Sequence, residues 1–83
     1  MGFGLTIRKI REKKGLTQKK VCFDIVTMSY YSRIERDISD PSITIFLKIL
    51  SRLNITFDEF MFIHNNYIEL TEDFFWFNIS ELY

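Results

Sequence analysis

Residues 28–36 combine hydroxyl and arginine side chains at a spacing that suits contact with a nucleic acid. On a helix of about 29–36, Tyr31 and Ile34 fall on one apolar side. Arginine can bind guanine O6 and N7 through two parallel hydrogen bonds, the commonest specific contact with a DNA base. A solvated helix surface is the alternative interpretation. The residues on the other face are Met28, Ser29, Tyr30, Ser32, Arg33 and Arg36.

Side chains for other kinds of chemistry are scarce. The 83 residues include one cysteine, Cys22, and one histidine, His64, which excludes a disulfide within the chain and the common zinc-ligand sets. No acidic residues are arranged with a nucleophile, and the three glycines form no phosphate-binding loop. We therefore expect no enzyme, no metal and no cofactor. Cys22 is predicted to be a small core residue, and His64 a surface or capping residue.

The net charge is zero, but the charges are unevenly distributed. Residues 1–36 hold nine Lys/Arg and three Asp/Glu, which is +6, whereas residues 37–83 hold two and eight, which is −6. Such a split indicates a basic face for a polyanion and an acidic remainder that meets something else. Solvated charge on short helices is the alternative.

Length and composition predict a globular protein. A chain of 83 residues with 47% apolar and 27% charged side chains fits one ordinary core. No apolar run approaches the roughly 18 residues of a membrane span, and charges from Arg8 onward interrupt any signal-like start. We expect a cytoplasmic protein without a membrane partner.

The apolar periodicity predicts an all-α fold. Gly15 suits the end of a first helix, Thr17 and Ser29 the starts of the next two, and Ser42 the start of a fourth. Thr56 and Glu59 match a capping box for a fifth. The expected helices are 4–14, 18–25, 29–36, 43–53, 57–64 and 72–82.

The fourth helix is expected to be the most buried. Phe46, Leu47, Leu50 and Leu53 share one side of it. Two further apolar residues, Ile43 and Ile49, widen that stripe.

Two short helices joined by a tight turn, with one helix before them and two after, follow the plan of a helix-turn-helix domain. The blocks that carry a closer likeness are Ile7–Gln18, Ser32–Arg36, Pro41-Ser42 and Leu53–Phe60. Together they resemble the phage-repressor-type (Xre/Cro) DNA-binding domains. The short connection before Ser29, Cys22 in the second helix and Phe60-Met61-Phe62 resemble the Rgg/GadR/MutR regulators of Gram-positive bacteria.

This resemblance implies a five-helix lambda-repressor-like fold and assigns roles to individual residues. Gln18 would contact a phosphate and brace the recognition helix, while Arg11 and Glu35 would form a structural ion pair. Ser29 and Arg33 would reach base edges. The remaining predicted DNA contacts, mostly to phosphate, are Lys19, Met28, Tyr30, Ser32 and Arg36.

The chain departs from the family pattern after the recognition helix. Asp37 stands where most relatives have glycine, and aspartate adopts the left-handed conformation only at some cost. Asp37 and Asp40 also make this loop acidic where many relatives are basic, which argues against DNA contacts from the loop.

Residues 1–66 are predicted to form the DNA-binding domain, and residues 67–83 a linker and the start of a C-terminal helical segment. One stripe of that segment, Phe75, Ile79 and Leu82, could dock on the five-helix core. Large apolar patches are rarely left in water, so Phe74, Trp76 and Phe77 are predicted to contact a second copy or a further domain.

The function expected from the sequence is sequence-specific binding of double-stranded DNA by a homodimeric transcriptional regulator. A peptide pheromone would be a partner only if a longer parent carries the C-terminal domain of the Rgg-like proteins. The alternative is a protein-interaction or antitoxin-like module that acts through its aromatic C-terminal segment.

Overall fold

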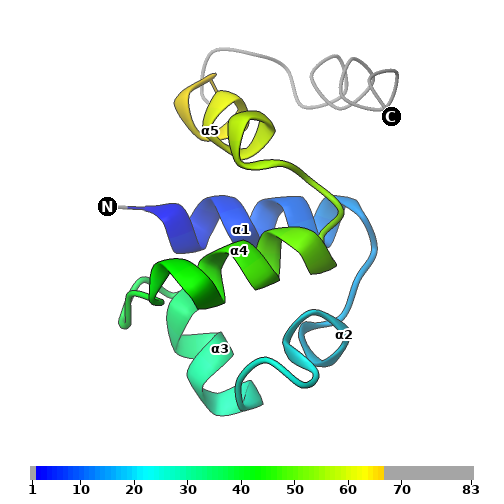
Figure 1. The fold of residues 1–83 in the computed structure, drawn as a ribbon, viewed down its shortest axis with the longest axis vertical. Helices are drawn as coiled ribbons and strands as arrows, with labels where there is room; N and C mark the ends of the chain where they lie inside the picture. The colour runs from blue at the N-terminus through cyan, green and yellow to red at the C-terminus, as the bar shows by residue number, and fades with distance from the viewer. Residues whose placement is uncertain (1, 67–83) are drawn as a thin grey trace.

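The computed structural model describes residues 2–66, which form five helices and no strand (Figure 1). The all-α prediction is confirmed. The predicted helix 72–82 lies outside the described residues. The helices are α1 (Phe3–Lys13), α2 (Gln18–Cys22), α3 (Met28–Glu35), α4 (Ile43–Arg52) and α5 (Phe57–Asn66).

Side-chain caps determine where four of the helices begin. Thr17, Thr27 and Ser42 each accept a hydrogen bond from the backbone N–H three residues later. At the start of α5, Thr56 and Glu59 form a reciprocal capping box, in which each side chain accepts the other residue's backbone N–H. Each cap satisfies an N–H that the helix itself leaves without a partner.

Left-handed residues end the helices and start the turns. Gly15 follows α1 with φ 71°, and Asn54 follows α4 with φ 59°. Asp24 and Asp37 take the same conformation after α2 and α3, with φ 64° and 60°. The predicted left-handed backbone at Asp37 is therefore observed.

The core is formed by apolar residues from all five helices. Contacts join α3 to α1 and α2, and join α5 to α1 and α4. Along the longest axis of the molecule, α2 and α3 lie at one end and α5 at the other (Figure 1). The side chains with no exposed area are Ile7, Ile10, Val21, Tyr31, Ile49, Leu53, Phe60 and Ile63.

An aromatic cluster joins α5 to the start of α1. The ring of Phe3 meets the rings of Phe60 and His64 edge-on, with centroids 5.6 and 4.6 Å apart. His64 Nδ1 also lies 2.8 Å from Thr6 Oγ1, within hydrogen-bond distance. The prediction of a surface or capping histidine is therefore wrong, because His64 is half-buried and links two helices.

Three predicted helix boundaries need correction. The second helix ends at Cys22 rather than residue 25, because the backbone turns into the left-handed region at Asp24. The third begins at Met28, capped by Thr27 rather than by Ser29. The fifth continues to Asn66, where the side-chain amide donates to the Phe62 carbonyl.

The predicted buried stripe of α4 is too wide. Phe46, Ile49, Leu50 and the capping residue Leu53 are buried, but Ile43 and Leu47 are 64% and 47% exposed. A helix can bury only the face that meets its neighbours, so part of this apolar surface stays open. None of the helices in the described region is long and apolar enough to cross a lipid bilayer.

Candidate nucleic-acid interface

The turn between α2 and α3 spans residues 23–27 and is anchored at both ends. Val21 and Cys22 are buried just before it, and Val26 packs against the core within it. The backbone N–H groups of Ile25 and Val26 both donate to the Cys22 carbonyl, at 2.9 and 3.1 Å. These bonds give the Cys22 carbonyl, at the end of α2, its hydrogen-bond partners. They also hold the start of α3 in a fixed direction.

The inner face of α3 is fully buried and its outer face is open. Tyr31, Ile34 and Glu35 have 0%, 1% and 3% of their surface exposed. Ser29 and Arg33 are exposed on the other side. The helix therefore presents a hydroxyl and a guanidinium while its buried face fixes its position.

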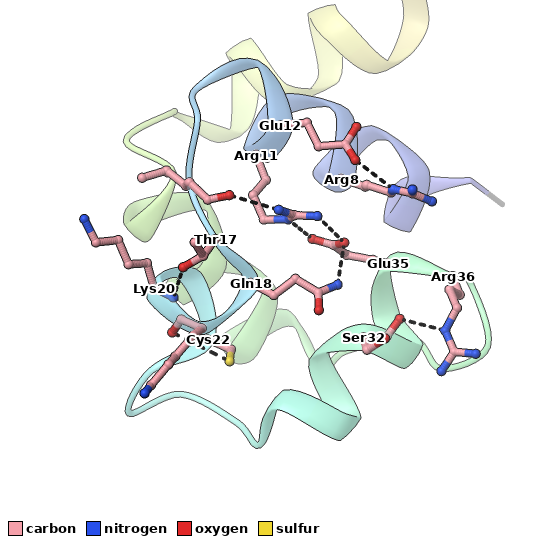
Figure 2. A network of polar contacts seen from close by, with 12 residues as sticks. Arg8, Arg11, Glu12, Thr17, Gln18, Lys20, Cys22, Ser32, Glu35 and Arg36 are labelled. Atoms are coloured by element: carbon pink, nitrogen blue, oxygen red, sulfur yellow. Dashed lines mark hydrogen bonds and ion pairs between the residues drawn. The ribbon is translucent and has the colours of Figure 1, made fainter.

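A network of polar side chains ties α3 to α1 and α2 (Figure 2). Arg11 donates to the Glu35 carboxylate twice, from Nε at 2.6 Å and from Nη2 at 3.2 Å. Its Nη1 donates to the Leu16 carbonyl at 2.9 Å, and Gln18 Nε2 donates to Glu35 Oε1 at 3.0 Å. Both oxygens of the buried carboxylate are thus satisfied, which such a group requires.

The electrostatics of this network keep the Arg11 guanidinium charged. The hydrogen bond from Arg11 to Glu35 raises the pKa of the guanidinium above its usual value, with the negative charge of Glu35 adding to the effect. A bidentate pair of this kind also fixes the relative orientation of the two side chains. The ion pair therefore helps to fix the angle between α1 and α3.

Burial raises the pKa of Tyr31 well above its usual value, and the nearby Glu35 carboxylate raises it further. The hydroxyl has no hydrogen-bond partner among the described residues, although it is fully buried. The phenol therefore stays neutral and contributes its ring to the core.

A second link joins the loop after α3 to the N-terminal end of α1. The backbone N–H of Gly4, in the first turn of α1, donates to Asp37 Oδ1 at 3.1 Å. A Cβ on Gly4 would lie only 1.9 Å from the Ile34 carbonyl oxygen, so the two backbones pack too closely for any side chain. Asp37, in the loop after α3, thus caps the N-terminus of α1. Its negative charge interacts favourably with the positive end of the α1 dipole.

The eight predicted DNA contacts come from two adjacent elements. Gln18 and Lys19 begin α2, and the other six lie on α3 or directly after it. Lys19, Ser29, Arg33 and Arg36 are exposed, and Met28 is 47% exposed.

Four of these predicted contacts, Gln18, Tyr30, Ser32 and Arg36, are partly engaged within the protein. Gln18 is half-buried against Glu35. Tyr30 is also half-buried, and its hydroxyl donates to the Asp40 carbonyl at 3.4 Å. Ser32 is half-buried, and its carbonyl accepts from Arg36 Nε at 3.3 Å. The predicted interface residues Phe74, Trp76 and Phe77 lie outside the described residues.

Sequence reasoning missed two groups that position this surface. Gly4 and Asp37 are 33 positions apart, and only the fold brings them together. Arg52 Nη1, at the end of α4, donates to the Lys20 carbonyl at 2.8 Å and so satisfies a carbonyl of α2. The glycine in an otherwise helical pattern was the available signal for close backbone packing.

The Lys and Arg residues are concentrated on and around α1–α3. Nine of the eleven Lys/Arg residues of the chain precede Asp37, whereas α5 holds Asp58 and Glu59 and no Lys or Arg. Five of those nine lie on or directly after α1, whereas residues 18–40, on and around α2 and α3, hold four Lys/Arg and four Asp/Glu. No group of acidic, histidine or cysteine side chains within residues 2–66 could hold a metal ion.

Comparison with known families agrees with this geometry. The family model described as helix-turn-helix matches residues 7–60, about two thirds of the chain. The chain belongs to the helix-turn-helix family. No solved structure matches the chain.

Membership of the helix-turn-helix family implies that the protein binds DNA, because this family consists of Xre/Cro-type DNA-binding domains. The matched residues include both helices of the motif, the Arg11–Glu35–Gln18 network and the start of α5. The arrangement is the small all-α lambda-repressor-like fold that the sequence predicted.

Proposed function

We propose that this protein is a sequence-specific DNA-binding domain of a bacterial transcriptional regulator, with α3 as its recognition helix. The observation that carries the proposal is the exposed Arg33 on a helix whose opposite face is fully buried. A side chain can select a base only when the helix beneath it is held in one orientation. The Arg11–Glu35–Gln18 network supplies that constraint.

The proposed division of contacts follows from position on the two helices. Ser29 and Arg33 read base edges in the major groove, with Met28 beside them. Lys19, Tyr30, Ser32 and Arg36 contact phosphates. The side-chain amide nitrogen of Gln18 has a second N–H beside the one that it donates to Glu35, and this second N–H contacts a phosphate. Phosphate contacts set register and orientation, whereas base contacts select the sequence.

The regulator is further proposed to act as a homodimer on a two-part operator. A single helix-turn-helix domain contacts few base pairs, so twofold pairing is the usual route to a specific site. The proposed pairing surface is Phe74, Trp76 and Phe77. The proposed relatives are the Rgg/GadR/MutR regulators, in which case a longer parent would bind a peptide pheromone through a further domain.

Selection of bound duplexes from a random DNA pool tests the proposal. We expect enrichment of a short motif, and affinity that falls steeply with added salt because Lys and Arg release counterions from the phosphates. A monomer should bind weakly, near the non-specific range of roughly 10⁻⁴ to 10⁻⁶ M. Binding that is unchanged between low and high salt, or enrichment of no sequence, would contradict the proposal and favour a protein-interaction module.

A further inference from the structure

An open apolar groove lies where the start of α1, the start of α4 and the start of α5 meet. Its volume is about 450 Å³. Ile7, Ile34 and Phe46 form its floor and are almost completely buried, whereas the rim residues Ile43 and Phe57 are 64% and 45% exposed. Ser39, Asp40 and Pro41, from the loop after α3, line the groove as well.

The rim residues create an apolar surface that residues 2–66 do not cover. Ile43 and Phe57 stand beside Leu47, which is 47% exposed and continues the apolar surface along α4. A protein surface of this kind usually marks a contact site, since water disfavours clustered apolar area. The groove therefore needs an occupant.

The end of the described part of the chain is linked to this groove through Phe3. Its last residue, Asn66, follows His64 by two positions, and the His64 ring packs on the ring of Phe3, which lines the groove. Residues 67–83 continue from there and contain four consecutive aromatic residues followed by Ile79 and Leu82. Phe75 is nine residues beyond Asn66, and nine residues can span up to about 30 Å. The groove is therefore within reach of the same chain.

We propose that the groove is the docking site for the C-terminal segment of the same chain, with Phe75 in the groove and Ile79 and Leu82 along the adjoining apolar surface. The three residues are spaced i, i+4 and i+7, which places them on one side of a helix. An aromatic side chain buries roughly 150–250 Å² and matches the aromatic walls formed by Phe3, Phe46 and Phe57.

The same chain is favoured over a second copy by local concentration. A segment tethered by a short linker is present at an effective concentration in the millimolar range, far above that of a dilute second copy. Phe74, Trp76 and Phe77 then remain on the other side of the segment. Docking would also place the segment against the loop that directly follows the recognition helix.

Disulfide trapping in the full chain tests this docking. Ile43→Cys is combined with Asn78→Cys, and the matched control combines Phe23→Cys with Asn78→Cys, so that Phe75, Ile79 and Leu82 all remain. Ile43 and Phe23 are equally accessible, at 64% and 62% exposed, but Phe23 directly follows α2 and lines no part of the groove. Both proteins carry Cys22→Ala, which removes the natural thiol.

After mild oxidation at low micromolar concentration, we expect an internal disulfide with monomeric mass in the Ile43 pair and several-fold less in the Phe23 pair. Equal yields in the two pairs would overturn the proposal. Disulfide-linked dimers of the Ile43 pair would also overturn it, by showing that a second copy fills the groove.

A second measurement does not depend on forming a disulfide. The single variant Ile43→Cys, again with Cys22→Ala, is labelled with a maleimide with and without Phe75→Ser. We expect several-fold faster labelling when Phe75 is replaced, because the rim is then uncovered. Equal labelling rates in two proteins with unchanged circular dichroism would overturn the proposal.

Discussion

Gln18, the first residue of α2, donates a hydrogen bond to Glu35, the last residue of α3, with 3.0 Å between Nε2 and Oε1. This bond closes the helix-turn-helix motif on itself, because its two ends are joined by side chains as well as by the turn. Arg11 holds the same carboxylate from α1. A change at Gln18 therefore affects the orientation of α3 as well as any contact that Gln18 makes with DNA.

Gln18→Ala should lower the free energy of unfolding by about 1.5 kcal/mol, the low end for a hydrogen bond to a charged group, because Gln18 is only half-buried. Urea denaturation followed by circular dichroism measures the change. The neighbouring Lys19→Ala is the control and should stay within about 0.5 kcal/mol of the parent protein, as exposed substitutions usually do. Equal stabilities for the two variants would show that the Gln18–Glu35 bond contributes nothing.

Glu35→Ala should be far more costly, at about 3–5 kcal/mol, because it leaves the Arg11 guanidinium without its buried partner. The exposed i,i+4 pair of Arg8 and Glu12 provides a matched control. Glu12→Ala should cost only about 0.2–0.5 kcal/mol, since water screens that pair. Thermal unfolding of both variants checks the contrast, and a nearly neutral Glu35→Ala would refute the structural role of the pair.

Arg33→Ala should relax the base preference at one position and cost about 1–3 kcal/mol there. The expectation rests on the proposed function and on the exposure of Arg33. Binding to a series of single-base variants of the selected site measures the effect, with Lys48→Ala on α4 as a control for lost charge. A uniform loss for every base at every position would make Arg33 a phosphate contact instead.

Tyr31→Phe should alter stability mainly at high pH. The folded protein raises the Tyr31 pKa above its usual value near 10, so the unfolded chain ionises first and stability falls as the pH rises above about 10. Tyr31→Phe removes this loss, which for one group reaches about 1.4 kcal/mol per pH unit. At pH 7 the variant should be at least as stable as the parent, because the hydroxyl lacks a partner.

The alkaline effect is measured as the difference between the stability profiles of the parent and variant proteins over pH 7–11. Tyr30→Phe serves as the control, since that side chain is only half-buried. It should retain the alkaline fall of the parent protein. A Tyr31→Phe profile that runs parallel to that of the parent would contradict the assigned pKa shift.

Gly4→Ala should destabilise the protein by about 3 kcal/mol or more, because the added Cβ meets the Ile34 backbone oxygen and neither helix can shift without opening the core. Gly15→Ala is the matched control. Its Cβ enters open space, so only the left-handed backbone costs energy, about 1–2 kcal/mol. Denaturation midpoints in the reverse order would show that the approach of α1 to α3 is less close than the structure indicates.

Local signals in the sequence predicted much of the fold. Thr17, Ser42 and the Thr56–Glu59 box each depend on atoms within three residues, so the sequence contains both partners of each hydrogen bond. Asp37 was expected to be left-handed from its place in the family pattern, and it is. The all-α class followed from helical periodicity in every segment.

Features that depend on tertiary partners could not be predicted. Ile43 has the hydropathy of a core residue but lies on a face of α4 that residues 2–66 leave uncovered. The early end of α2 comes from a left-handed Asp24, a conformation that glycine or asparagine would have signalled more strongly. His64 meets Thr6 across 58 positions, and no local pattern encodes that contact.

At the candidate site, the pairing of Arg11 with Glu35 was expected from family resemblance, whereas the bond from Gln18 to the same carboxylate was not specified. A structural role of Asp37 was not predicted. Its charge argues against DNA contacts from the loop, and in addition the carboxylate accepts the Gly4 N–H and serves the start of α1. Sequence reveals the charge of a side chain but not the group that it faces.

The separation of charge along the long axis also bears on kinetics. Residues 2–56 hold eleven Lys/Arg and five Asp/Glu, a net +6, whereas α5 holds Asp58, Glu59 and no Lys or Arg, so the described body is an electric dipole with α5 at its negative end. In the field of a DNA duplex, we expect such a body to rotate before contact, so that more encounters begin with the proposed recognition helix facing the grooves. Orientation of this kind raises the association rate constant and leaves dissociation nearly unchanged.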